Sequence, residues 1–162
     1  MNGRDNGVTA AGVVLGVGLG GFVDGIVLHQ LLQWHHMLSN WSLPRTLENM
    51  ELNTLWDGLF HLFTLACVAA GLVMLWRAAR RPHFEWSGSR FAGALLMGWG
   101  GFNIVEGLIN HVWLGVHHVN EQVPSWQWAY WDWGFIVASA AIFLIGLALN
   151  ARASRGLARG AA

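Results

Sequence analysis

Residues 8–33 read VTAAGVVLGVGLGGFVDGIVLHQLLQ, an apolar run with one aspartate and one histidine near its C-terminal end. A hydrocarbon core about 30 Å thick is spanned by roughly 20 apolar residues in an α-helix. Three further stretches, about 52–76, 91–116 and 126–149, meet the same requirement. No small-residue cleavage site follows the first stretch, so we do not expect a signal peptide. The sequence therefore predicts an all-α, integral-membrane four-helix bundle in a single domain, residues 1–162.

The overall composition agrees with a membrane protein. Hydrophobic residues make up 54% of the chain and charged residues 11%, against about 25% charged residues in an average soluble domain. The net charge is zero, which gives no reason to expect a nucleic-acid partner. Cys67 is the single cysteine, so an intramolecular disulfide and a cysteine-rich metal site are both excluded.

The placement of arginine predicts the orientation in the membrane. Eight arginines lie on one side of the predicted spans: Arg4, Arg77, Arg80, Arg81, Arg90, Arg152, Arg155 and Arg159. Only Arg45 lies on the other side. By the positive-inside rule, both termini are expected in the cytoplasm of a bacterium, with the protein in the inner membrane. Tryptophans crowd the opposite helix ends as an expected aromatic belt: Trp34, Trp41, Trp56, Trp113, Trp126 and Trp128.

An internal repeat relates the first and third stretches at an offset of 82 residues. The aligned segments are VDGIVLH (23–29) with VEGLINH (105–111) and HHM (35–37) with HHV (117–119). A weaker match, at an offset of 75 residues, relates WD (56–57) of the second stretch to WD (131–132) of the fourth. Two apolar helices share leucine and glycine by chance, but not an acid, a glycine and three histidines in register. We therefore expect two repeated helical hairpins, about 8–76 and 91–149, related by a pseudo-twofold axis along the membrane normal.

Ionisable residues accumulate in the outer half of the predicted spans. Such residues are costly in a membrane, usually face a bundle interior and mark function. The candidate metal ligands are His29, His61, His111, Asp24, Asp57, Glu106 and Asp132. A rise of about 1.5 Å per residue places them in two layers about one turn apart. Facing histidines and carboxylates are also the ligands of di-iron and di-manganese bundles, so we expect a mononuclear or dinuclear metal site.

Ligand spacing complicates this site. Asp57 and His61 are four residues apart and can chelate one ion, whereas Asp24 and His29, like Glu106 and His111, are five apart. Five residues correspond to about 140° around an α-helix, so some of the acids are expected to orient histidines instead of binding metal. Two asparagines are expected to support the ligands by hydrogen bonds, Asn53 and Asn110. The outer histidines are expected to serve as metal-entry groups or additional ligands: His35, His36, His117 and His118.

The motifs GFVDGIVLHQ (21–30), LQWHH (32–36) and LWDGLFH (55–61), with EGL at 106–108 and His111, resemble a bacterial family described only as predicted membrane proteins of unknown function. The resemblance covers nearly the whole chain. It implies a membrane location and no particular activity. A link to oxidase assembly, which handles copper, is a further implication of the resemblance and slightly favours copper as the metal.

Three functions are consistent with this sequence. The first is a membrane metal-binding protein with its site on the periplasmic side, acting in redox chemistry or metal handling, with copper or iron favoured over zinc or manganese. The second is a b-type cytochrome with haem held by two of His29, His61 and His111. The third is an ion or proton transporter, although the inner half offers few polar residues.

The sequence identifies no catalytic residue, because neither a nucleophile elbow nor a nucleotide-binding loop is present. If the protein is an enzyme, we expect a metal-dependent membrane oxidoreductase that meets a quinone or oxygen. An oxidase-assembly protein is the expected partner if the protein handles metal. The lipid bilayer is the expected surroundings in either case.

Overall fold

The computed structural model describes residues 6–82 and 84–160. The helices are α1 (Asn6–Val23) continued by the π-helix η1 (Asp24–Leu31), α2 (Leu47–Ala79), α3 (Gly88–Glu106) continued by the π-helix η2 (Gly107–Trp113), and the 3₁₀ turn η3 (Ser125–Gln127) followed by α4 (Trp128–Gly160). All four long helical segments have the length and apolar composition to cross a membrane. The prediction of an all-α chain with four candidate spans is therefore confirmed.

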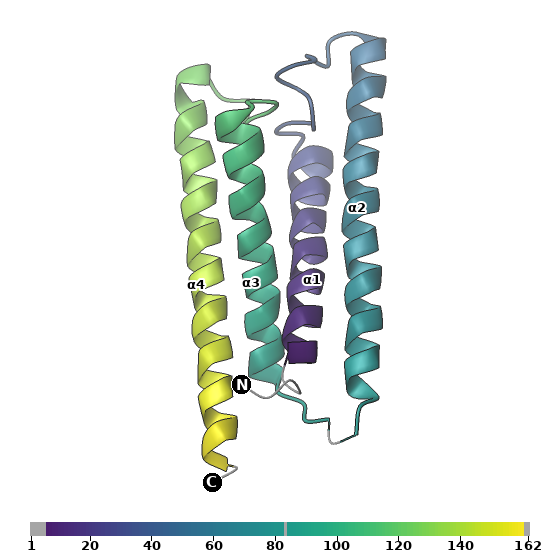
Figure 1. Ribbon diagram of the computed structural model, residues 1–162. Coiled ribbons are helices and arrows are strands. Elements are labelled where there is room, and N and C mark those ends of the chain that lie inside the picture. The colour runs from purple at the N-terminus through teal and green to yellow at the C-terminus, as the bar shows by residue number, and fades with distance from the viewer. Residues whose placement is uncertain (1–5, 83, 161–162) are drawn as a thin grey trace.

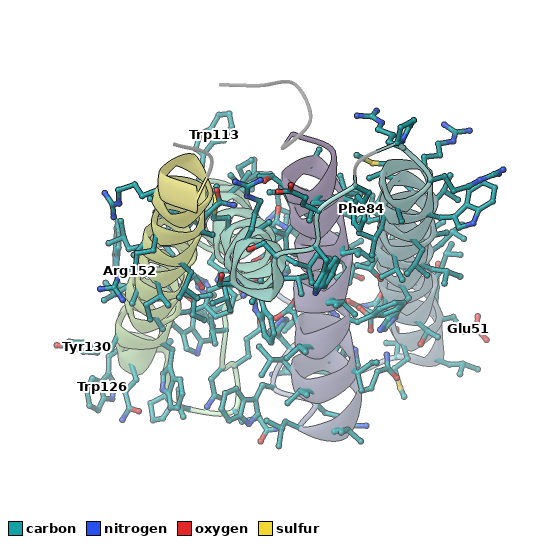
Figure 2. The ribbon with its side chains drawn as sticks, turned by 90° about the horizontal axis from the view of Figure 1, so that it is seen from below. Glu51, Phe84, Trp113, Trp126, Tyr130 and Arg152 are labelled. Atoms are coloured by element: carbon teal, nitrogen blue, oxygen red, sulfur yellow. The ribbon has the colours of Figure 1, made fainter. Side chains whose placement is uncertain are left out.

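The four helices lie side by side in a row, in the order α4, α3, α1, α2 (Figure 1). Within the described part of the chain, α2 does not pack against α4. Figure 2, which looks along the helices, accordingly shows Tyr130 of α4 and Glu51 of α2 at opposite edges. The helices of the predicted four-helix bundle thus form a row in which neither α1 nor α3 is enclosed on all sides. Because each outer helix has one neighbour in the row, most of its apolar surface stays exposed, as for Leu55 (58%) and Val137 (66%).

Glycines allow the two central helices, α1 and α3, to approach closely. A Cβ atom added to Gly16 would lie 2.1 Å from the carbonyl oxygen of Leu95, and one added to Gly98 would lie 2.0 Å from that of Val13. Small residues at helix crossings permit such backbone contact. The two contacts are equivalent at an offset of 82 residues, the offset of the sequence repeat.

Both π-helices end in a chain reversal. Gln33 (φ 51°) and Gly115 (φ 57°) adopt the left-handed conformation two residues after η1 and η2, respectively. The helices therefore end at Leu31 and Trp113, a few residues before the predicted ends of the spans, and the following residues turn back toward the helix axes. We call this end of the molecule the site end, and the end that carries both termini the termini end (Figure 1).

The two loops at the site end hold each other. The first loop is residues 32–46 and the second is residues 114–124. The backbone N–H of Asn40 donates to the carbonyl oxygen of Val116 at 3.0 Å, and the backbone N–H of Glu121 donates to the carbonyl oxygen of Trp34 at 2.9 Å. The Trp34 ring also packs edge-on against Trp131 of α4, with 5.1 Å between centroids. The loops therefore cover the site end of the central helices and join the two hairpins there.

Candidate metal centre

The two π-helices bring an acid and a histidine of the same segment together. Asp24 Oδ2 lies 3.5 Å from His29 Nε2, and Glu106 Oε1 lies 3.3 Å from His111 Nε2. A π-turn closes with an i→i+5 hydrogen bond, so residues five apart become neighbours. Our expectation that these pairs diverge by about 140° was wrong because it assumed α-helical geometry throughout.

The chain reversals add two more histidines to this place. His35 and His117 stack with their rings nearly parallel (4°) and 4.5 Å between centroids. His29 lies 4.5 Å from His35 and His111 lies 4.8 Å from His117 by the same measure. We call these four residues the histidine core, and each is at most 2% exposed. The sequence indicated only an entry or accessory role for His35 and His117, yet they lie at its middle.

Hydrogen bonds determine which nitrogen of three of these rings carries the proton. The Nδ1 atoms of His35 and His117 each donate to a carbonyl oxygen of the opposite loop, Val119 O and Met37 O, at 2.9 Å. His29 Nδ1 donates to Asp57 Oδ1 at 2.9 Å. A neutral imidazole that donates from Nδ1 has its lone pair on Nε2, the arrangement found in metal-bound histidines.

Most of the remaining ring nitrogens make no hydrogen bond, although Nε2 of His29 and of His111 each lies near a carboxylate. Among the described residues, Nε2 of His29, Nε2 of His35 and both ring nitrogens of His111 are buried and make no hydrogen bond. His117 Nε2 instead faces Glu106 Oε1 at 3.2 Å. Since a neutral His117 and an ionised carboxylate are both acceptors there, a proton or a metal ion must lie between them. Unsatisfied buried acceptors that converge on one place form a site for a cation.

Two sets of ligand atoms lie close enough to surround a metal ion. The first triad is His29, His35 and His117, and the second triad is Glu106, His111 and His117, with all atoms of each set within 4.8 Å of one another. Ligand atoms about 2.1 Å from a tetrahedral ion are about 3.4 Å apart, so a small contraction of either triad would complete the geometry. His117 belongs to both.

Asp57 and Asp132 lie next to the histidine core and accept hydrogen bonds from the loops. Asp57 accepts from His29 and the Met37 amide through Oδ1, and from His36 through Oδ2 at 2.7 Å. On α4, Asp132 accepts from the Val119 amide at 2.9 Å and from His118 at 2.7 Å. The oxygen nearest His111 is 3.7 Å away. These carboxylates are occupied by hydrogen bonds and orient other groups.

The other predicted site residues lie outside both triads. His61 donates from Nδ1 to the carbonyl of Asp57 at 2.9 Å and stacks on Phe22, while its buried Nε2 has no hydrogen-bond partner in the described structure. Asn53 holds the first loop, accepting from the Leu38 amide. Asn110 donates to Glu106 Oε1 at 3.2 Å, which agrees with a supporting role.

His35 lies outside the membrane-spanning segments, and its surroundings favour the neutral ring. Burial lowers the pKa of His35 well below its ordinary value, and the neighbouring His117 and His29 lower it further. The hydrogen bond to Val119 O acts in the opposite direction and is weaker. His35 therefore keeps an unprotonated Nε2 that can bind metal.

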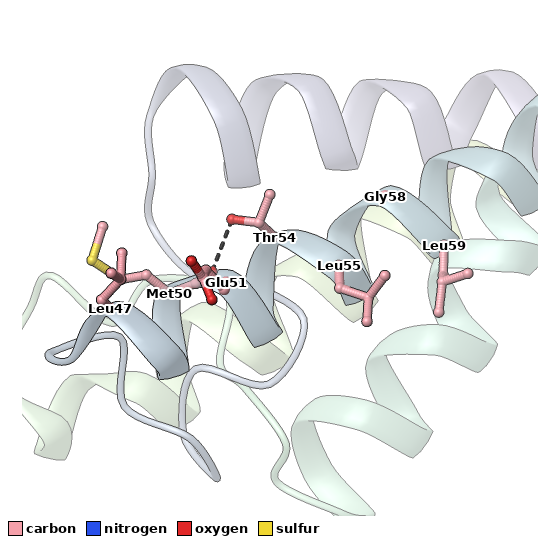
Figure 3. Close-up of a pocket in the computed structure, with 7 residues that line it drawn as sticks. All are labelled: Leu47, Met50, Glu51, Thr54, Leu55, Gly58 and Leu59. Carbon is pink, nitrogen blue, oxygen red and sulfur yellow. Dashed lines mark hydrogen bonds between the residues drawn. The ribbon is translucent and has the colours of Figure 1, made fainter.

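A groove on α2 is separate from the histidine core. It is lined by Leu47, Met50, Glu51, Thr54, Leu55, Gly58 and Leu59, which follow one another along the helix (Figure 3). Leu55 and Leu59 are 58% and 45% exposed, whereas Asp57 between them is 2% exposed. The groove therefore lies on the lipid-facing side of α2, away from the metal ligands.

Comparison with known proteins gives one match. Residues 11–153 match the profile of the family described as "Predicted membrane protein (DUF2243)". No curated protein and no solved structure matches the chain. Because the match covers most of the sequence, the chain belongs to this family of membrane proteins of unknown function.

Proposed function

We propose that this member of the DUF2243 family is a membrane metal-binding protein whose centre is the histidine core with Asp24 and Glu106. One observation carries the proposal. Imidazoles from two helices and two loops converge in a buried place, and the Nδ1 atoms of three are held by acceptors so that Nε2 faces inward. Of these three Nε2 atoms, that of His35 has no hydrogen-bond partner, which would cost about 1–3 kcal/mol in a purely structural network. Those of His29 and His117 face the carboxylates of Asp24 and Glu106, and a bound cation would satisfy both groups.

The geometry favours one ion in a triad that contains His117. Its Nδ1 donates to Met37 O, so only Nε2 can bind a metal, and the two triads cannot use this ring for separate ions at the same time. A dinuclear centre would place the second ion between His29 and His35, with Asp24 as the carboxylate. Such a centre would have equivalent halves, since Asp24, His29 and His35 correspond to Glu106, His111 and His117 at the repeat offset.

We propose copper or iron as the metal, in redox chemistry or in metal handling. Imidazole suits copper, iron and zinc, and the carboxylates neutralise charge in a low-dielectric site. We also propose that the chain is a duplicated hairpin with its termini in the cytoplasm and its centre on the periplasmic side of the inner membrane. Paired contacts at one offset support the duplication, and the arginines at the termini end support the orientation.

A haem centre has less support. The space between His29 and His111 is taken by the stacked rings of His35 and His117. His29 is also covered by Phe60, stacked at 5.7 Å between centroids. Transport has less support for another reason. Toward the termini end, the buried polar residues of the described spans are Thr64, Asn103, Ser139 and Arg90. The first three lie within seven residues of Asp57, Glu106 or Asp132 in the sequence, so Arg90 is the one buried polar residue in the far half of these spans, within the part of the chain that the structure describes.

The test is metal analysis of the purified protein together with its visible spectrum. We expect at least one copper or iron ion per chain after purification or after reconstitution of the apoprotein with that ion, and no Soret band. A protein that takes up no metal above the level of a variant lacking His29, His35, His111 and His117 would contradict the proposal. A Soret band at stoichiometric intensity would favour the cytochrome.

Replacing Asp57 by asparagine is expected to weaken metal binding by about 10- to 100-fold, the usual effect of removing a carboxylate that orients a histidine ligand. In asparagine an NH2 group replaces one carboxylate oxygen, so the side chain can no longer accept hydrogen bonds from both His29 and His36. Competition titration against a chelator of known affinity measures the change. Glu51→Gln, on the exposed face of the same helix, is the matched control and should bind as the wild type does. Equal affinity in Asp57→Asn would show that His29 needs no such support.

A further inference from the structure

We infer that His36 is the group through which metal ions enter and leave the buried centre, with His118 as a slower equivalent. The inference rests on the proposed metal-binding function. It assigns separate roles to adjacent histidines: His35 and His117 hold the ion, and the residues that follow them exchange it with water.

The centre itself is closed. His29 and His117 are fully buried, and the interlocked loops cover the site end. A hydrated divalent ion cannot cross the hydrocarbon core, because an unpaired charge there costs many kcal/mol. The ion must therefore arrive from the aqueous side of the loops, and histidines at that boundary are the first ligands that it meets.

His36 has the properties of an exchange ligand. Its Nδ1 donates to Asp57 Oδ2 at 2.7 Å, so the lone pair is on Nε2. Its side chain is 27% exposed, in contrast to the buried histidine core. Asp57 accepts from His29 through its other oxygen. The same carboxylate therefore contacts both His36 and a ligand of the first triad.

His118 repeats this arrangement in a more covered position. Its Nδ1 donates to Asp132 Oδ2 at 2.7 Å. The ring is 18% exposed and stacks on Trp128, with 4.5 Å between centroids. Asn53 lies four residues before Asp57, as Trp128 lies four residues before Asp132. Asn53 bonds the loop backbone and does not cover His36. The first hairpin therefore has the more open route.

The decisive variant is His36→Asn. The asparagine amide nitrogen lies near the position of Nδ1 and keeps the bond to Asp57, while the exposed Nε2 ligand is lost. The probe is Co²⁺ alone, mixed with apoprotein in detergent and followed by its visible absorbance, and then removed with EDTA. We expect loading and release to slow by the same factor, roughly tenfold, as for a barrier about 1.4 kcal/mol higher. The Kd should stay unchanged.

Other results would overturn the inference. Unchanged rates in His36→Asn would show that the ion enters elsewhere. A faster release with weaker affinity would show that His36 helps to hold the bound ion. His36→Ala, which removes both ring nitrogens, serves as a second variant if the first does not fold, and His118→Asn should slow both rates less than His36→Asn. If the wild type itself binds no Co²⁺, no copper and no iron, the proposed function fails, whereas wild-type binding with normal rates in both His36 variants defeats the entry route alone.

Discussion

Replacing His117 by alanine is expected to lower metal affinity by 100-fold or more, beyond the roughly 10- to 100-fold effect of losing a residue that supports a ligand. His117 is the one residue common to both triads, so neither can form without it. The loss of its bond to Met37 O also frees the loop that carries His35 and His36. Metal content after dialysis and a competition titration measure the effect.

His61→Ala is the informative control for this experiment. His61 is also a histidine in the half of a span nearest the site end, yet it lies outside both triads. We expect this variant to retain wild-type metal content. If His61→Ala loses its metal and His117→Ala does not, the ligands are those indicated by helical spacing on α2, and the histidine core is only a packing feature. Circular dichroism checks that both variants keep their helices.

The repeat in the sequence contained more information about the site than the spacing of its ligands. Histidine and acid in register at positions 24, 29, 106 and 111 predicted that these groups act together. Spacing argued against this, because five residues separate each pair. No feature of local composition indicates a π-helix, since η1 and η2 consist mainly of glycine, leucine, isoleucine and valine, residues that are also common in α-helical spans. Tertiary packing against α2 and α4 therefore decides the local geometry.

The roles of the adjacent histidines were also beyond the sequence. His35 and His36 are the same residue type at adjacent positions, so the sequence does not show which of them faces the core and which faces outward. The left-handed conformation at Gln33 sends His35 inward and leaves His36 partly exposed. Glycine at the equivalent position, Gly115, is compatible with a positive φ, but a glutamine gives no such signal.

The arrangement of the helices could be predicted only in part. Four spans and close glycine contacts follow from composition and from the small residues of the first span. Whether four helices close into a bundle or form a row depends on which faces meet. On α2, polar and small residues mark one face, Asn53, Asp57, Thr64 and Gly71, and the structure buries that face. Such a stripe indicates which side is buried but not which of the other helices it meets, so it does not decide between a bundle and a row.

Gly98→Ala is expected to destabilise the fold more than any other single-methyl change in the spans. The added Cβ would lie 2.0 Å from the carbonyl oxygen of Val13 and 3.0 Å from the Cα of Gly16. Both obstacles are backbone atoms of α1, so no side-chain rotation relieves the clash, and the central helices must separate. Overpacking usually costs about 1–3 kcal/mol and occasionally more. At roughly 2–4 °C per kcal/mol, a cost of about 3 kcal/mol should lower the melting temperature by about 6–12 °C.

Gly134→Ala makes the same chemical change where space is open, since no atom lies within 4 Å of the added Cβ. Alanine favours a helix interior over glycine by about 1 kcal/mol in water, so this variant should melt at or above the wild-type temperature. Thermal melting of both variants in the same detergent separates the effect of the clash at the α1–α3 crossing from the general effect of replacing a glycine. Because the α1–α3 crossing supports the two π-helices, Gly98→Ala should also lose metal while Gly134→Ala retains it. Equal melting temperatures for the two variants would show that α1 and α3 do not meet at Gly98, and the histidine core would then lack the backbone contact that brings its two halves together.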